Sequence, residues 1–196
     1  YSIADNYMSI ENAKEPLANR SIEERDQFFA EYEQLILKGA GIEVSDQLAR
    51  QVWLMAINIP KSFTLFDDVL PTLAILKRHN VTLGVISNLR QNMSKLCEEL
   101  GLASFLDFCV TSLEAGAEKP HSPVFIAALE KAKVNPSEAI HIGDQYNSDV
   151  QGAQAVGIVP VLLDRNGWYN NVNDCTKIAS LTELDRLLRR SLQHHK

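Results

Sequence analysis

Three kinds of side chain that could together bind an anion and a metal follow short apolar runs in this sequence. They are a hydroxyl, a lysine and a pair of carboxylates, found at Ser87–Asn88, Lys119–Pro120, Gly143–Asp144 and Asp149. A hydroxyl and free N–H groups at a helix start bind anions, and a lysine offsets the repulsion between carboxylates and a phosphate. Two carboxylates can supply the oxygen ligands that a hard cation such as Mg²⁺ prefers. The residue types therefore predict a phosphate and metal site.

Each of these residues has a plainer interpretation when it is taken alone. Ser87 can be an ordinary helix N-cap, and Lys119 can be a solvated loop lysine. Ser148 or Asp149 can cap the helix that follows, although this leaves Asp144 unexplained. His141, on an apolar run, is predicted to be a satisfied core histidine rather than a ligand. The joint occurrence of the hydroxyl, the lysine and the acidic pair at strand ends of one predicted sheet favours the site.

The elements that position these residues begin at Phe63, where short apolar runs alternate with helical segments. Four runs predict strands buried on both faces, at residues 81–86, 108–110, 139–142 and 159–163. Alternating strands and helices predict an α/β fold, with a Rossmann-type parallel sheet and helices on both faces. Ligands of such sheets bind at the carboxyl ends of the strands, which is where the polar residues stand.

The first 62 residues have a purely helical pattern. Ser21-x-x-Glu24 is a capping box before one helix, and Ser45 can cap a second helix that Pro60 stops. The apolar stripe of the second helix is predicted to be its packing face; it consists of Leu48, Val52, Met55 and Ile59. The alternative is a surface that covers an active site. We therefore expect a helical domain over residues 1–62 and an α/β domain over residues 63–196.

Several segments resemble the second, third and fourth motifs of the haloacid dehalogenase-like (HAD) hydrolase superfamily. The matching segments run in the family's order and are Val85–Asn88, Thr111–Ser112, Lys119–Pro120 with Phe125, His141–Asp149, Gly152–Ala153 and Ala155–Gly157. The sequence looks most like the phosphatase-type branch with a helical cap, because the 2-haloacid dehalogenases of the superfamily lack this Gly–Asp pairing. The resemblance implies that residues 1–62 are the cap and residues 63–196 the core.

The resemblance also implies roles for five residues. Ser87 would hydrogen-bond the phosphate, Asn88 would order its loop, and Lys119 would bridge the nucleophile and the phosphate. Asp144 would bind Mg²⁺, and Asp149 matches a second acid that ligates the metal in some members. The implied activity is Mg²⁺-dependent hydrolysis of a phosphate monoester, with a small phosphorylated metabolite as substrate and an aspartyl phosphate as intermediate.

The attacking aspartate of the family is missing from these residues. Family members begin with a strand followed by D-x-D, and this sequence contains no D-x-D. Asp67 and Asp68 are predicted to cap the helix that follows them, and Asp5 has too little before it to end a strand. Losing a central strand would leave buried ladder groups unpaired, at about 1–3 kcal/mol each. We therefore expect the first strand, its nucleophile and the first part of the cap to lie upstream in the parent chain.

Two rival functions stay open. A HAD-like scaffold without a nucleophile could be a catalytically inactive binding or regulatory module that keeps Ser87, Lys119 and Asp144 as an anion and metal pocket. A nucleotide-binding doubly wound domain is less well supported, since neither G-x-G-x-x-G nor a P-loop follows any predicted strand.

Composition limits the partners. The formal charge of −6 and the pI near 5.4 argue against a nucleic-acid partner. No apolar run approaches the roughly 20 residues of a membrane helix, so we expect no membrane partner. The three cysteines, Cys97, Cys109 and Cys175, form no C-x-x-C pair. They are predicted to be reduced thiols of a cytoplasmic protein.

Overall fold

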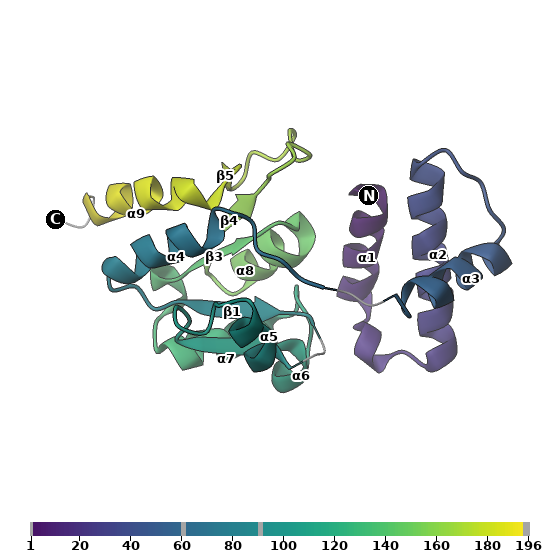
Figure 1. Ribbon diagram of the computed structural model, residues 1–196, viewed down its shortest axis with the longest axis horizontal. Helices are drawn as coiled ribbons and strands as arrows, with labels where there is room; N and C mark the ends of the chain where they lie inside the picture. Colours follow the sequence, from purple (N-terminus) through teal and green to yellow (C-terminus); the bar gives the residue numbers. More distant parts are fainter. Residues whose placement is uncertain (1, 60–61, 90–91, 194–196) are drawn as a thin grey trace. The chain divides into compact units, whose positions relative to one another are not determined.

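The computed structural model describes residues 2–59, 62–89 and 92–193 (Figure 1). These residues form two compact units, divided between Ser62 and Phe63. That the first unit is a cap and the second a HAD-like core without its first strand stays a prediction. In the part of the chain that the structure describes, no helix combines the length and the apolar character needed to cross a membrane.

The first unit is helical, as its sequence pattern predicts. It contains α1 (Ser2–Lys14), the short 3₁₀ helix η1 (Leu17–Asn19), α2 (Ile22–Gly39) and α3 (Asp46–Ala56). The capping box of α2 is formed in both directions between Ser21 and Glu24. Ser45 caps α3 by accepting a hydrogen bond from the Leu48 N–H at 3.3 Å. Pro60, the predicted stop of this helix, lies outside the described residues.

The packing face predicted for α3 was wrong. Met55 is 72% exposed, and Leu48 and Ile59 are exposed as well. The helix instead packs through Ala49, which is fully buried, and through Trp53. The Trp53 ring stacks on Phe29 of α2 with centroids 3.9 Å apart. A small residue that permits close approach and an aromatic pair therefore select a face beside the one that the aliphatic stripe marks.

Among the described residues of the second unit, all strand pairs are parallel, which confirms the predicted α/β class. Its strands are β1 (Gly84–Ser87), β2 (Phe108–Thr111), β3 (Ile140–Gly143), β4 (Val159–Leu163) and β5 (Thr176–Ile178). β1 pairs with β2, and β4 lies between β3 and β5. The sequence pattern did not predict β5, because its three residues are too few to show a period.

Helices cover both faces of these strands (Figure 1). The helices of this unit are α4 (Val69–Arg78), α5 (Met93–Glu99), α6 (Ser112–Ala115), α7 (Ser122–Ala132), α8 (Gln151–Ala155) and α9 (Leu184–Gln193), with 3₁₀ turns at η2 (Pro136–Glu138) and η4 (Leu181–Glu183). One apolar core joins Val110 of β2 to Phe125 of α7 and Ala153 of α8. The other joins β4 and β5 to Leu76 of α4 and Leu184 of α9. The strands thus lie between two helix layers.

The strands form two sheets rather than the single predicted sheet. Within the described residues, no backbone ladder connects the β1–β2 sheet to the β3–β4–β5 sheet. The β1 edge that faces away from β2 and the β3 edge that faces away from β4 therefore each lack a strand partner there.

Asp68 has a different role from the helix cap that the sequence predicts. Its side chain makes no capping bond to α4. Its two carboxylate oxygens instead accept hydrogen bonds from both terminal nitrogens of Arg165, at 2.8 and 2.9 Å. The Ser180 hydroxyl and the Leu181 N–H also donate to it, at 2.7 and 2.9 Å. Asp68 therefore ties the start of α4 to the segments that follow β4 and β5.

Replacing Asp68 by asparagine should destabilise the protein by about 2 kcal/mol at pH 7, since charge-assisted hydrogen bonds contribute about 1.5–3 kcal/mol. The Arg165 guanidinium holds the pKa of Asp68 well below its ordinary value. A lowered folded pKa gives stability that is present above the unfolded value of about 4 and lost as the pH falls through the folded one. Urea unfolding at pH 7 and pH 3 should therefore show a smaller difference between Asp68→Asn and wild type at pH 3. The exposed neighbour provides the control: Asp67→Asn should change little at either pH.

Candidate active site

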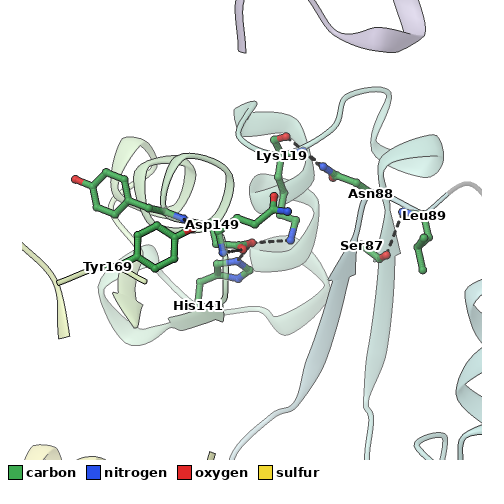
Figure 2. Close-up of polar contacts among 9 residues, drawn as sticks. Ser87, Asn88, Leu89, Lys119, His141, Asp149 and Tyr169 are labelled. Carbon is green, nitrogen blue, oxygen red and sulfur yellow. Dashed lines mark hydrogen bonds and ion pairs between the residues drawn. The ribbon is translucent and has the colours of Figure 1, made fainter. Parts of the chain in front are cut away.

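The predicted site residues come from the carboxyl ends of two strands and from one loop. Ser87 is the last residue of β1, and Asp144 directly follows β3. Lys119 lies in the loop between α6 and α7. Figure 2 shows the side chain of Lys119 extending to Asp149 and its backbone facing Asn88. The structure thus joins Asn88, Lys119 and Asp149, which the sequence separates by 31 and 30 residues.

The helix start predicted directly behind Ser87 is not there. Helix α5 begins at Met93, and its cap is Asn92, whose side chain accepts a hydrogen bond from the Lys95 N–H at 3.1 Å. The Ser87 hydroxyl accepts from the Leu89 N–H at 3.1 Å, a local turn contact (Figure 2). The helix start predicted behind Ser87 and the plain N-cap interpretation of Ser87 were therefore wrong, and its role in binding an anion stays a prediction. What Ser87 offers at this strand end is a hydroxyl on a short turn.

The side-chain amide of Asn88 holds the backbone of Lys119 on both sides. The Lys119 N–H donates to Asn88 Oδ1 at 2.8 Å, and Asn88 Nδ2 donates to the Lys119 carbonyl at 3.2 Å. One asparagine thus satisfies one backbone donor and one backbone acceptor of a loop residue. The β1 turn therefore fixes where the Lys119 side chain starts.

Asp149 is the buried centre of the site. Its side chain is only 4% exposed, and Lys119 Nζ lies 2.6 Å from its Oδ1. His141 Nε2 lies 3.1 Å from the same oxygen, while the Gln145 N–H donates to Oδ2 at 3.0 Å. Asp149 makes no cap on α8, whose first residues show no side-chain capping bond. Both carboxylate oxygens are therefore engaged with protein donors.

The backbone between Gly143 and Asp149 brings the carboxylate of Asp149 close to β3. Residues Tyr146–Val150 form one turn of π-helix, in which the Gln151 N–H donates to the Tyr146 carbonyl. This turn folds Asp149 back over β3. A Cβ on Gly143 would lie 2.5 Å from the Cβ of Asp149 and would overlap its carboxylate. The glycine was predicted to let the backbone approach a ligand; in the structure it makes room for Asp149.

The charge of Asp149 depends on its two cationic or polar neighbours. Burial by itself raises the pKa of Asp149, but the hydrogen bond from His141 and the positive charge of Lys119 outweigh it. The pKa of Asp149 consequently lies well below its ordinary value, and the carboxylate stays ionised.

Asp144 is the other acid for which the sequence predicts a metal-binding role. It is exposed at the end of β3, beside the turn that holds Asp149. Among the described residues, no group of three histidine, cysteine or acidic side chains is arranged to hold a metal. Mg²⁺ commonly takes one or two carboxylates and completes its shell with water and substrate phosphate, so a single carboxylate is compatible with it. Asp149 would first have to give up Lys119, His141 or Gln145, and its contacts suit a positioning role.

Sequence reasoning did not foresee the connection between His141 and the site. The prediction of a satisfied core histidine agrees with a ring that is 11% exposed and hydrogen-bonded to Asp149. The available signal was strand alternation, because His141 and Gly143 are two residues apart and lie on one face of β3. The contact of Tyr146 with Asp174, in which the phenol donates, had no sequence signal. It links the π-turn to the loop before β5.

Parallel strands between two helix layers, with polar and charged residues at their carboxyl ends, define a Rossmann-type α/β protein. A family model described as haloacid dehalogenase-like hydrolase matches residues 3–157. The chain belongs to this family. The resemblance stated from the motifs is therefore confirmed.

Individual relatives agree with the family. The mouse protein "Haloacid dehalogenase-like hydrolase domain-containing protein 3" is 34% identical over 120 residues, which are 61% of this chain and 46% of the relative. "Ribulose-1,5-bisphosphate 5-phosphatase" of Halopiger xanaduensis is 33% identical over 127 residues, 64% of this chain and 53% of the relative. The chain thus spans about half the length of the curated relatives it matches. A solved structure of a 2-haloacid dehalogenase from Pseudomonas syringae pv. Tomato is 27% identical, covers 95% of this chain and 80% of its own, and gives a TM-score of 0.60.

Proposed function

We propose that the parent protein hydrolyses phosphate monoesters of small metabolites with the help of Mg²⁺. The observation that carries the proposal is Lys119, whose ammonium group is held 2.6 Å from the buried Asp149 carboxylate at the strand-end site. A fixed ammonium group with its own counter-ion stabilises negative charge that develops on a transferring phosphoryl group. Relatives named as phosphatases support this choice of substrate class.

The residues of this chain bind and orient the phosphate. The Ser87 hydroxyl accepts from the Leu89 N–H and can donate its own proton to one phosphate oxygen. Lys119 approaches another oxygen while Asp149 keeps it in place. Asn88 keeps the Lys119 backbone at the end of β1. Mg²⁺ held at Asp144 would neutralise part of the phosphate charge and leave phosphorus more open to attack.

The attacking group in this proposal is an aspartate from a strand upstream of Tyr1. Its carboxylate oxygen attacks phosphorus, the bond to the alcohol oxygen breaks, and a second acid protonates the leaving alcohol. Water then attacks phosphorus and frees the carboxylate, releasing inorganic phosphate. The split between the β1–β2 and β3–β4–β5 sheets supports this origin, because the open edges of β1 and β3 could both pair with such a strand. Ser87 and Asp144 follow those two strands.

The protein expressed from the natural start of its reading frame tests the proposal with p-nitrophenyl phosphate. We expect turnover that requires Mg²⁺, stops with EDTA, and yields an acid-quenched peptide about 80 Da heavier, the mass of one phosphoryl group bound to the nucleophile. Chloride release from 2-chloropropionate without metal would instead favour a dehalogenase, the activity named for the Pseudomonas structure. Phosphate binding without turnover of any ester would favour the inactive binding module.

A further inference from the structure

His141 lies behind the candidate site and contacts it through Asp149. Its ring is 11% exposed, and its Nε2 lies 3.1 Å from Asp149 Oδ1. That oxygen is the one that Lys119 Nζ approaches to 2.6 Å. Lys119 supplies the positive charge that pairs with the carboxylate, and His141 adds a second contact to the same oxygen. The histidine contact therefore calls for a separate explanation.

The ring of His141 is itself held from a second side. Phe125 of α7 meets it edge to face, with ring centroids 5.1 Å apart and planes at 85°. Phe125 is fully buried and packs close to Gly152, where a Cβ would come within 2.7 Å of the phenylalanine ring. The core thus orients the imidazole, and the imidazole can orient the carboxylate.

Three donors together determine the orientation of the Asp149 carboxylate. The Gln145 N–H fixes Oδ2 at 3.0 Å, and His141 and Lys119 share Oδ1. Lys119 is a long side chain with several rotatable bonds, so it follows the carboxylate rather than fixing it. Without the imidazole, Oδ1 would be held only by the flexible partner. The lysine ammonium would then lose a defined position.

We propose that His141 is a positioning residue, which holds Asp149 so that the Lys119 ammonium group stays where the phosphate will bind. The inference rests on the proposed function for its catalytic consequence. His141 lies on β3, two residues before Gly143–Asp144, the motif for which metal and phosphate binding is proposed. A plain packing role against Phe125 is the competing explanation.

Two substitutions separate these explanations because each keeps one property of the histidine. His141→Gln can still donate a hydrogen bond to Asp149 but loses the aromatic contact with Phe125. His141→Phe keeps an aromatic ring but cannot donate. In the protein expressed from its natural start, we expect His141→Phe to lower kcat about 10- to 100-fold with KM within about twofold, as for loss of a hydrogen bond to a charged group. His141→Gln should stay within about fivefold of wild type.

The reverse order of the two variants would overturn the proposal, because packing would then be the property that matters. If His141→Phe does not fold, as judged by circular dichroism, His141→Gln decides alone, and a kcat loss above about tenfold overturns the idea. If wild type shows no turnover, the proposed function fails and a second readout applies. Mass spectrometry then follows acylation of Lys119 in the 196-residue chain, with the exposed Lys95 as internal reference. Faster acylation of Lys119 in His141→Phe but not in His141→Gln supports the positioning role; equal rates overturn it.

Discussion

Lys119→Met should lower kcat by about 10²–10³ and also destabilise the fold, and adding Asp149→Asn should restore the stability without the activity. Lys119 is the fixed positive charge nearest to Asp149, and electrostatic groups of this kind are each responsible for about 10²–10³ in kcat. Its removal leaves an ionised carboxylate that is 4% exposed and hydrogen-bonded by His141 and Gln145. Breaking a buried ion pair from one side costs about 3–5 kcal/mol. The asparagine removes the stranded charge and keeps an oxygen that can accept from His141.

The measurement is a double-mutant cycle of urea unfolding combined with steady-state kinetics in the protein expressed from its natural start. We expect Lys119→Met to lose about 3 kcal/mol, and the double variant to return to within about 1 kcal/mol of wild type, since both members of the pair are then uncharged. Lys95→Met is the matched control, because Lys95 is an exposed lysine that pairs only with the exposed Glu99 among the described residues. Equal stability of Lys119→Met and Lys95→Met would show that Asp149 does not depend on the lysine.

The parts of the site that sequence could predict are those set by local order. Ser87 and Asp144 each follow an apolar run directly, and the carboxyl end of a buried parallel strand is where such residues become functional. The ends of β1 and β3 fall where the runs end, within one residue. Strand type and direction followed from the alternation with helices. These features depend on neighbours in the chain, which a single sequence displays.

The parts that sequence could not predict depend on contacts between distant segments. Nothing near Lys119 indicates that its ammonium group meets a carboxylate 30 residues later. The π-turn at Tyr146–Val150 has no composition of its own, and it decides that Asp149 faces β3 rather than capping α8. The prediction of the packing face of α3 was wrong for the same reason, because Trp53 packs on the ring of Phe29 in another helix. Each of these three contacts depends on which side chain of a distant segment lies next to the residue. The pattern of apolar residues along one segment does not contain that information.

Gly143→Ala should damage stability and activity together, although it adds a single methyl group. The new Cβ would lie 2.5 Å from the Cβ of Asp149 and would overlap the carboxylate carbon. Asp149 cannot yield easily, because it is buried and three donors hold its two oxygens. Overpacking of a tight site costs about 1–3 kcal/mol, and the displaced carboxylate also loses hydrogen bonds worth about 1 kcal/mol or more each. We expect a loss near 3 kcal/mol and a fall in kcat of about 100-fold or more, because Lys119 would lose its anchor.

Gly39→Ala is the control that separates this clash from a general effect of replacing glycine. Gly39 ends α2, and a Cβ there would meet nothing within 4 Å. Alanine has the higher helix propensity, so this variant should be neutral or more stable by up to about 1 kcal/mol. Calorimetry of both variants and kinetics of Gly143→Ala complete the test. A Gly143→Ala protein with wild-type melting and turnover would mean that Asp149 can leave β3 freely. In that case the contacts of Asp149 with His141 and Lys119 would not be what holds the site residues in position.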